Sequence, residues 1–264
     1  MVQWPADRLS AARLPPTKSI MQYLFVVTYG RSGSTALINL LNAIDGYCIR
    51  GENGGVIAQL AKAAHTLHAS HTEQTRPRNT GPDSPWYGID QAQPEGFARA
   101  LADEFICGVL APPTGTRVTG FKEIRYMPQH LSDDEFNQTI TFMAANFANS
   151  RFIFNTRDAG EVSRSGWWAT SKKHSASDVK KLVTQSDARF QSWNDKLQER
   201  AFMVDHAQYD GKPEGFGPLL DWLGEELPAQ RLEEISQERL NHLKTDKAKE
   251  KQSPSRLRGW LKSK

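Results

Sequence analysis

A short polar run between two apolar segments contains the residues best suited to hold an anion. Gly30 to Thr35 reads Gly-Arg-Ser-Gly-Ser-Thr and lies between an apolar run at 23–27 and an apolar series that starts at Ala36. Arg31 supplies a permanent positive charge. Three hydroxyl groups add hydrogen-bond donors, those of Ser32, Ser34 and Thr35. These residue types in one short run predict the binding of phosphate or sulfate.

The flanking segments predict how this run is presented. Tyr23 to Val27 is rich in aromatic and β-branched residues, which favours a strand covered on both faces. From Ala36 onwards apolar residues recur at helical spacing, so we expect a helix to begin between Gly33 and Ala36. The first N–H groups of a helix lack intrahelical partners and carry partial positive charge. A strand that enters such a helix through Gly30 and Gly33 makes a pocket for an anion, and an ordinary strand-to-helix turn is the alternative.

Charged residues also follow two further predicted strands. Residues 117–125 read as a core strand that ends near Lys122 and Glu123, and 152–154 read as a buried strand that ends shortly before Arg157. Ligands of open parallel sheets bind beyond the carboxyl ends of the strands, so these residues are candidates for a site. A planar guanidinium suits two-point contact with phosphate. A surface ion pair between Arg157 and a neighbouring Asp158 or Glu161 is the alternative.

The polar run is not the loop of the nucleoside triphosphate-binding proteins, because Ser34 stands where that loop needs a lysine. Instead, Thr28 to Leu41 resembles the 5′-phosphosulfate-binding loop of the sulfotransferases that use 3′-phosphoadenylyl sulfate (PAPS). Cytosolic members often have lysine at the position of Arg31, whereas carbohydrate and bacterial members often have Arg-Ser-Gly-Ser-Thr, as here. Cytosolic members also stack adenine on a tryptophan just after the hydroxyl pair, where this chain has Ala36, so the adenine contact is expected elsewhere.

The resemblance implies how the reaction centre is built. Members of the family place a lysine on the strand that here carries Lys122, and it reaches the bridging oxygen of the phosphosulfate. Cytosolic members have a catalytic histidine two positions later, where this chain has Ile124. The base is therefore expected to be Glu52, which follows the first helix in a short segment, with Glu123 or a histidine as reserve. Taken alone, a glutamate in a loop is most often a solvated surface group.

The resemblance also implies the co-substrate. An arginine at a strand end and a serine eight residues later, on the following helix, hold the 3′-phosphate in the family; here these are Arg157 and Ser165. PAPS is then the co-substrate and adenosine 3′,5′-bisphosphate (PAP) the product, and no metal ion is needed.

Composition bounds the fold and the partners. The chain has 264 residues, 38% of them hydrophobic, so we expect one three-layer αβα P-loop-like domain with a central parallel sheet over 1–264. A net charge of +3, from 33 basic and 30 acidic residues, disfavours a general nucleic-acid binder. Cys48 and Cys107 are too few for a disulfide framework. We therefore expect a reducing cytoplasm, and since no run approaches the ~18 apolar residues of a membrane span, a soluble enzyme.

Three segments depart from the regular pattern. Residues 1–20 are a poorly patterned lead-in, and 245–264 form a charged tail. Residues 65–96 are polar and rich in proline, glycine and threonine, which predicts either a mobile lid or a disordered insertion. As a lid, it would offer Trp86 and Tyr87 as an apolar wall of the acceptor site. Three histidines recur at three-residue spacing without a carboxylate or cysteine to complete a metal site, namely His65, His68 and His71.

The sequence therefore predicts transfer of a sulfuryl group from PAPS to a hydroxyl or amine of a small-molecule or carbohydrate acceptor, with a carboxylate base. Two alternatives stay open. One is a P-loop nucleotide kinase, for which Asp205 at a strand end would be a metal-binding acid. The other is a non-catalytic nucleotide-binding protein on the same fold. Neither the acceptor nor the oligomeric state follows from the sequence.

Overall fold

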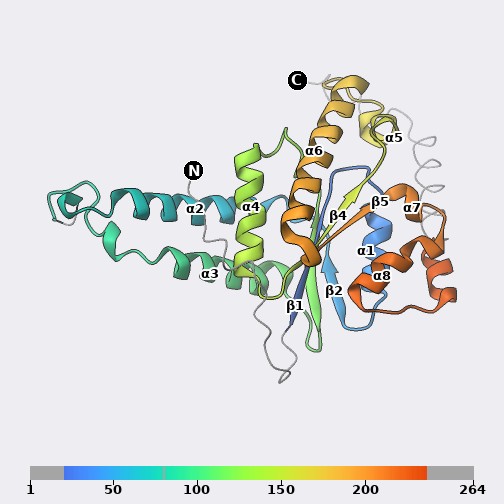
Figure 1. Cartoon of the computed structure of the whole chain (residues 1–264), viewed down its shortest axis with the longest axis horizontal. Coiled ribbons are helices and arrows are strands. Elements are labelled where there is room, and N and C mark those ends of the chain that lie inside the picture. The colour runs from blue at the N-terminus through green and yellow to red at the C-terminus, as the bar shows by residue number, and fades with distance from the viewer. Residues whose placement is uncertain (1–20, 80, 237–264) are drawn as a thin grey trace, which may run out of the picture. The chain divides into compact units, whose positions relative to one another are not determined.

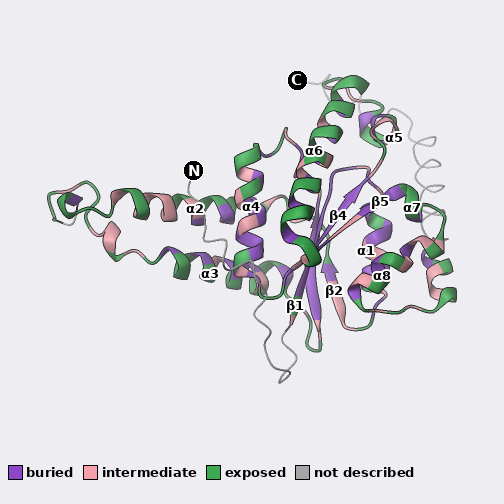
Figure 2. Ribbon diagram, viewed as in Figure 1, coloured by how far each residue is buried: buried purple, intermediate pink, exposed green. Residues whose placement is uncertain are grey.

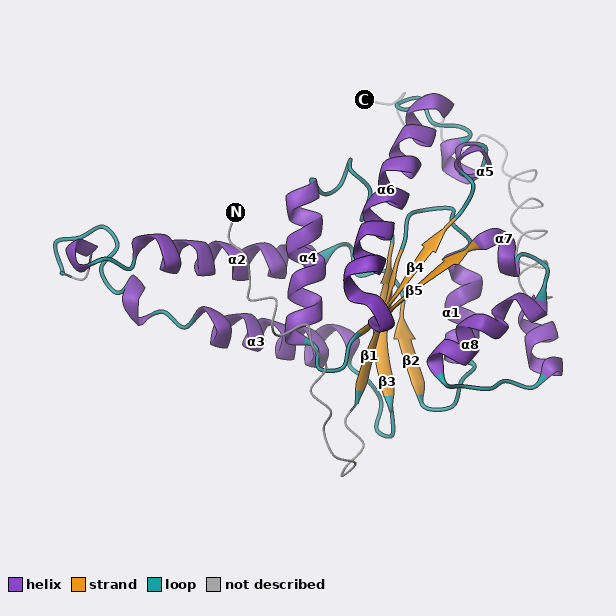
Figure 3. Cartoon of the chain, in the orientation of Figure 1, coloured by secondary structure: helices purple, strands orange, loops and turns teal. Residues whose placement is uncertain are grey.

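The computed structural model describes residues 21–79 and 81–236, and the predicted lead-in 1–20 and tail 245–264 lie outside these residues. Five parallel strands form one sheet in the order β2-β3-β1-β4-β5. Figure 3 labels these strands. Their bounds are β1 Gln22–Val27, β2 Tyr47–Arg50, β3 Val118–Glu123, β4 Arg151–Thr156 and β5 Ala201–Asp205. Because the strands are parallel, their carboxyl ends lie at one edge of the sheet, where ligands of such sheets bind.

The central strand β1 is buried because almost all of its side chains are apolar. Tyr23, Phe25 and Val27 belong to a large aromatic core on one face, and Leu24 and Val26 are buried on the other face, as alternation along a strand requires. Figure 2 shows burial along the central strands, whereas the edge strands β2 and β5 are only partly buried. The polar loop therefore follows the central strand of the sheet.

Helices cover both faces of the sheet, and Figure 1 shows α1 on one side with α4 and α6 on the other. The helix bounds are α1 Ser34–Asn42, α2 Val56–Gln74, α3 Pro94–Phe105, α4 Asp133–Asn146, α5 Ala159–Ser163, α6 Ala176–Leu197, α7 His206–Tyr209 and α8 Gly217–Leu223. Shorter turns are η2 Pro77–Asn79, η3 Ile89–Gln91, η4 Ile106–Leu110, η5 Gly166–Trp168, η6 Gln198–Arg200 and η7 Pro213–Phe216. The predicted three-layer α/β class with a parallel sheet is confirmed.

Two of the long helices begin at serine caps. The Ser132 hydroxyl accepts the N–H of Glu135 at the start of α4, while the Glu135 carboxylate accepts the N–H of Ser132. Ser175 and Asp178 make the same reciprocal pair at the start of α6. Each pair satisfies two N–H groups that the helix itself leaves without partners, which fixes where the helix starts.

The predicted insertion at 65–96 is not one irregular loop. Residues 65–74 complete helix α2, and α3 begins at Pro94 and packs against α2, so the segment that connects the two helices is limited to 75–93 (Figure 3). The last buried residue of α2 is Ala64. After Ala64 the helix has no row of buried side chains (Figure 2). The sequence of this half therefore lacks the apolar periodicity that would predict a helix.

The chain divides after Ala207 into two compact units, 1–207 and 208–264. The first unit contains the sheet and helices α1 to α6. The described part of the second contains η7 and α8, and the rings of Tyr209 and Phe216 stack within it with centroids 5.0 Å apart. One domain over 1–264 stays a prediction. Within 21–79 and 81–236, no helix combines the length and apolar character that crossing a bilayer requires.

Candidate active site

The predicted anion loop joins β1 to α1 in a backbone conformation that few residues can adopt. Arg31 and Gly33 have positive φ angles of 71° and 82°. A β-carbon at Gly33 would collide with the imidazole ring of His206, so this position excludes larger residues by space as well as by conformation. Gly33 is the N-cap of α1 and provides no side-chain cap. The first N–H groups of α1 are therefore directed at the loop without a side chain to occupy them.

Three buried polar residues hold the loop in place. Thr28, Ser32 and Asn155 are each 0% exposed. The Thr28 hydroxyl oxygen lies 2.7 Å from the Ser32 hydroxyl oxygen and 2.8 Å from the main-chain oxygen of Asn155. The Asn155 amide donates to the main-chain oxygen of Ser32 at 3.2 Å. The Ser32 hydroxyl, expected to face a ligand, is thus engaged inside the protein, because these contacts close a buried polar network that is costly to open.

The other two hydroxyl residues of the loop differ in exposure. Ser34 is buried at the first position of α1, and Thr35 is exposed at the second. Of the three hydroxyl groups predicted from the sequence, that of Thr35 is therefore the most accessible. Thr28 and Asn155 were not singled out as site residues, although both are polar residues directly at the ends of apolar strand runs.

The anion loop and the segment after β4 meet. Arg31 Nε donates to Ser165 Oγ at 3.1 Å, and Arg157 Nη1 donates to the main-chain oxygen of Arg31 at 3.0 Å. Arg157 Nε also pairs with Glu161 Oε2 at 2.9 Å, the ion pair that the sequence offered as the alternative. The two anion-binding candidates lie side by side, and Arg157 makes the loop contact and the ion pair together.

Ser165 does not lie on the helix after β4, contrary to the expectation. Helix α5 ends at Ser163, and Ser165 has extended backbone angles ahead of the turn η5. Gly166 then takes a positive φ angle of 53°, and a β-carbon there would lie 2.6 Å from Arg31 Nε. The absence of a side chain at Gly166 thus leaves room for the Arg31 side chain that bonds to Ser165.

Trp167 lies beside the loop, and the sequence reasoning did not select it. Trp167 is 52% exposed, and the guanidinium carbon of Arg31 lies 5.5 Å from the centroid of its ring. The ring covers Gly30 so closely that a β-carbon there would overlap it. A half-exposed tryptophan offers a flat apolar surface to a ligand. The available signal was a pair of tryptophans immediately after the segment that holds Ser165.

Lys122 and Glu52 form an ion pair beyond the carboxyl end of the sheet. Lys122 Nζ lies 2.5 Å from Glu52 Oε1, and the two side chains are 9% and 38% exposed. The pair forms because β2, which precedes Glu52, is the direct neighbour of β3, which carries Lys122. A buried cation and a more accessible carboxylate therefore face the same edge as the anion loop.

Glu123 has a different role from Glu52. It is 0% exposed, and its carboxylate accepts four main-chain N–H groups. Oε2 accepts those of Asn53 at 3.2 Å and Gly55 at 2.8 Å, and Oε1 accepts those of Ile124 at 2.8 Å and Arg125 at 3.2 Å. The first two bonds fix the loop that carries Glu52. This geometry makes Glu123 an anchor for that loop and gives no support to the reserve base.

The residues considered as metal ligands do not form a metal site. Asp205, considered as a metal-binding acid, accepts the Thr156 hydroxyl at 2.9 Å and the N–H of Ala207 at 2.9 Å. His65 and its two companions lie along helix α2. In the described part of the chain, no three His, Cys, Asp or Glu side chains gather in a way that would hold a metal ion.

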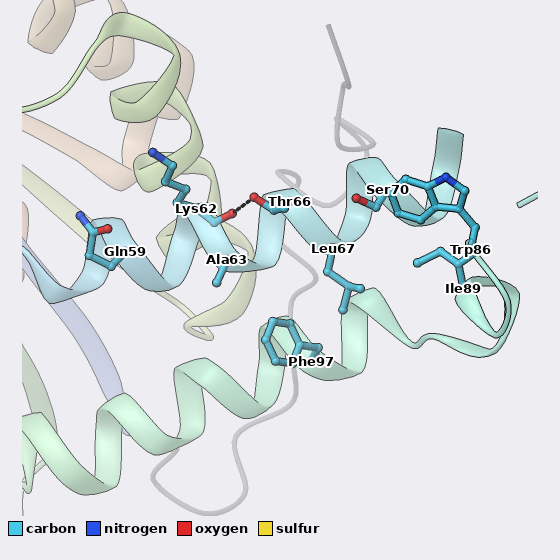
Figure 4. Close-up of a pocket in the computed structure, with 9 residues that line it drawn as sticks. All are labelled: Gln59, Lys62, Ala63, Thr66, Leu67, Ser70, Trp86, Ile89 and Phe97. Carbon is cyan, nitrogen blue, oxygen red and sulfur yellow. Dashed lines mark hydrogen bonds between the residues drawn. The ribbon is translucent and has the colours of Figure 1, made fainter. Parts of the chain in front are cut away.

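An apolar groove of about 700 Å³ lies between α2, η3 and α3 (Figure 4). Leu67 and Phe97 point into it from the two helices, and Trp86 and Ile89 lie at the end away from the sheet. Tyr87, which the sequence paired with Trp86, does not line the groove and is 64% exposed. Two helices and the segment 75–93 that connects them therefore build this surface together.

Comparison with known proteins places the chain in a family. The profile described as the sulfotransferase family matches residues 23–229. No curated protein matches the chain. Among solved structures, the chain is similar to sulfotransferase STF9 from Mycobacterium avium, with 13% sequence identity, a TM-score of 0.34, and coverage of 84% of this chain and 68% of that one. Because the family profile spans most of the chain, including the loop, Lys122 and Arg157, this protein belongs to the sulfotransferase family.

Proposed function

We propose that this chain transfers a sulfuryl group from PAPS to a hydroxyl or amine group of a small-molecule or carbohydrate acceptor. The contact of Arg31 with Ser165 and Arg157 carries the proposal, because it unites two phosphate-binding candidates from distant parts of the chain. PAPS bears a 5′-phosphosulfate and a 3′-phosphate on one ribose, so it requires two anion sites close together. Membership of the sulfotransferase family supports sulfuryl transfer as the reaction.

In the proposed reaction the acceptor oxygen or nitrogen attacks sulfur while the bond between sulfur and the bridging oxygen breaks. The acceptor proton passes to Glu52, and the bridging oxygen leaves with the bonding electron pair as part of the 5′-phosphate of PAP. Lys122 stabilises the charge that develops on that oxygen. The N–H groups of the loop and the Arg31 side chain stabilise the other phosphosulfate oxygens, as positioned donors do in phosphoryl transfer.

The ion pair between Lys122 and Glu52 supports this division of roles. Lys122 is the more buried partner and Glu52 the more accessible one, as a group facing the donor and a group facing the acceptor would be. Lys122 Nζ contacts the Oε1 atom of Glu52. We therefore assign proton transfer to Oε2, which needs to lie within hydrogen-bond reach of the acceptor.

The test uses the full chain and two ligands. Calorimetric titration with PAP in the presence of a chelator should give tight binding, and ATP with magnesium should bind more weakly. Transfer of labelled sulfate from PAPS is then measured with a panel of sugars, alcohols and amines. Binding of ATP with magnesium in preference to PAP would favour the kinase. Tight PAP binding with no transfer to any acceptor would favour the non-catalytic nucleotide-binding protein.

A further inference from the structure

A buried tyrosine lies between the two phosphate-binding segments and belongs to neither of the residue sets described above. Tyr29 is 0% exposed and directly precedes Gly30 of the anion loop. Its ring stacks on Phe190 of helix α6, with centroids 6.0 Å apart and an interplanar angle of 12°. The aromatic contact accounts for the ring, but it does not account for a hydroxyl group in a buried place, which requires polar partners.

The hydroxyl group of Tyr29 has such partners in both segments that surround it. It accepts the main-chain N–H of Arg157 at 2.8 Å, and it lies 2.9 Å from Asp187 Oδ1 on α6. The main-chain oxygen of Arg157 is slightly farther away, at 3.1 Å. A hydroxyl has one proton, and a carboxylate is the stronger acceptor, so the proton points to Asp187 and the lone pair to Arg157.

The ionisation of both groups fits this arrangement at neutral pH. Burial and the nearby carboxylate of Asp187 raise the pKa of Tyr29 well above its ordinary value, so the phenol keeps its proton. Burial also raises the pKa of Asp187 to about 6, which leaves it largely ionised at pH 7. The order Asp187, Tyr29, Arg157 is therefore a directed chain of hydrogen bonds that ends on the main chain of Arg157.

Arg157 is held at both of its ends by residues of one short segment. Its main-chain N–H is bonded to Tyr29, and its guanidinium is bonded to the main-chain oxygen of Arg31. These two partners are separated in the chain only by Gly30. The bond to Tyr29 fixes the main chain of Arg157, and the bond to Arg31 fixes the guanidinium group at the end of its side chain.

We propose that Tyr29, supported by Asp187, is a positioning residue that places Arg157 for the 3′-phosphate and so makes the site discriminate PAP from adenosine 5′-phosphate. This inference rests on the proposed function, because it concerns the same nucleotide. Tyr29 touches no reacting atom in this scheme. It acts through Arg157, and its effect should appear in the preference for the 3′-phosphate.

The experiment measures the ratio of the dissociation constants of adenosine 5′-phosphate and PAP by calorimetry. Tyr29→Phe keeps the ring and removes the hydroxyl. The loss of one hydrogen bond at a buried site should lower this ratio about tenfold, chiefly because PAP binds less tightly. Phe190→Leu is the matched control. It removes the stacking partner, so it should lower the melting temperature and leave the ratio unchanged.

A double-mutant cycle separates action through Arg157 from a general loss of structure. In the Arg157→Ala background, Tyr29→Phe should cause no further fall in the ratio, because the group being positioned is gone. Asp187→Asn, which retains an oxygen acceptor for the phenol, should keep most of the ratio, whereas Asp187→Leu should lower it. An equal fall in both Arg157 backgrounds, or an unchanged ratio in Tyr29→Phe, would overturn the inference.

The same titrations distinguish this failure from failure of the proposed function. A wild-type chain that binds PAP no more tightly than adenosine 5′-phosphate would overturn the proposed function together with the role of Tyr29. A wild-type chain that prefers PAP, with a Tyr29→Phe variant that prefers it equally, would overturn the role of Tyr29 alone.

Discussion

The Nε atom of Arg31 lies 3.1 Å from the Oγ atom of Ser165, although 134 residues separate the two in the chain. Arg31 also has a φ angle of 71°, a conformation that costs a non-glycine residue about 1–3 kcal/mol. Its side chain bonds to Ser165 and its main-chain oxygen to Arg157. The second segment therefore helps to hold the anion loop in its strained conformation, and the two phosphate-binding candidates form one structure.

Replacing Arg31 with alanine should weaken the binding of PAP and reduce turnover. Hydrogen bonds to charged groups are worth about 1.5–3 kcal/mol, so we expect the dissociation constant of PAP to rise about tenfold to hundredfold. Arg31→Lys, which keeps the positive charge, should lose much less. Calorimetry and a sulfate-transfer assay measure both quantities. Unchanged PAP affinity and turnover in Arg31→Ala would contradict the assignment of this loop to the binding site.

Glu52→Gln should separate chemistry from binding. The amide keeps the shape of the side chain but accepts no proton, so kcat should fall by about 10²–10⁴ while PAP affinity stays close to that of the wild type. Steady-state kinetics and PAP titration on the same preparation provide the measurement. If Glu52→Gln turns over at the wild-type rate, another group is the base.

Glu123→Gln is expected to act on stability first. The carboxylate accepts four main-chain N–H groups, and an amide has one oxygen fewer to offer them. Each N–H left without a partner costs about 1–3 kcal/mol. Thermal unfolding should therefore show a lower melting temperature, accompanied by slower turnover because the Glu52 loop loosens. A variant with wild-type stability and no activity would instead identify Glu123 as the base.

Gly33→Ala should damage the loop through the backbone. The residue has a φ angle of 82°, and its new β-carbon would meet the ring of His206. The left-handed conformation alone costs an alanine about 1–2 kcal/mol. We expect a lower melting temperature and weaker PAP binding. Gly81→Ala is the matched control, since nothing lies within 4 Å of a β-carbon there; equal effects of the two changes would contradict the prediction.

The carboxyl group of Asp187 should make stability depend on pH between about 4 and 6. Burial and the nearby Asp205 raise its pKa from 3.8 to about 6, while its bond to Tyr29 opposes the rise. The folded chain then binds more protons than the unfolded chain in this range, so this contribution to stability is full below about 4 and is lost as pH rises through about 6. Urea unfolding of the wild type and Asp187→Asn across pH 4 to 7 isolates it. A difference between them that does not change with pH would contradict the assignment.

Local features of the fold were predictable because they depend on neighbours in the chain. The apolar run at 23–27 is a buried strand, the polar residues after it form a loop, and a helix begins at Ser34. Ser132 caps α4 through a side chain only three residues away from its partner. The same local logic failed where the signal was weak. Residues 65–74 are helical with no buried side chain to mark a face, and α5 ends at Ser163, ahead of Ser165 and of the left-handed Gly166.

The residue types of the site could be read from the chain alone, because the guanidinium groups, the lysine and the carboxylates lie at or near strand ends and helix starts that their neighbours define. Which of these residues contact one another depends on how the strands and helices pack. The order β2-β3-β1-β4-β5 brings Glu52 to Lys122 and Arg157 to Arg31, and the packing of α6 brings Asp187 to Tyr29. These pairs depend on contacts between strands and helices far apart in sequence, and spacing along the chain contains no record of that order.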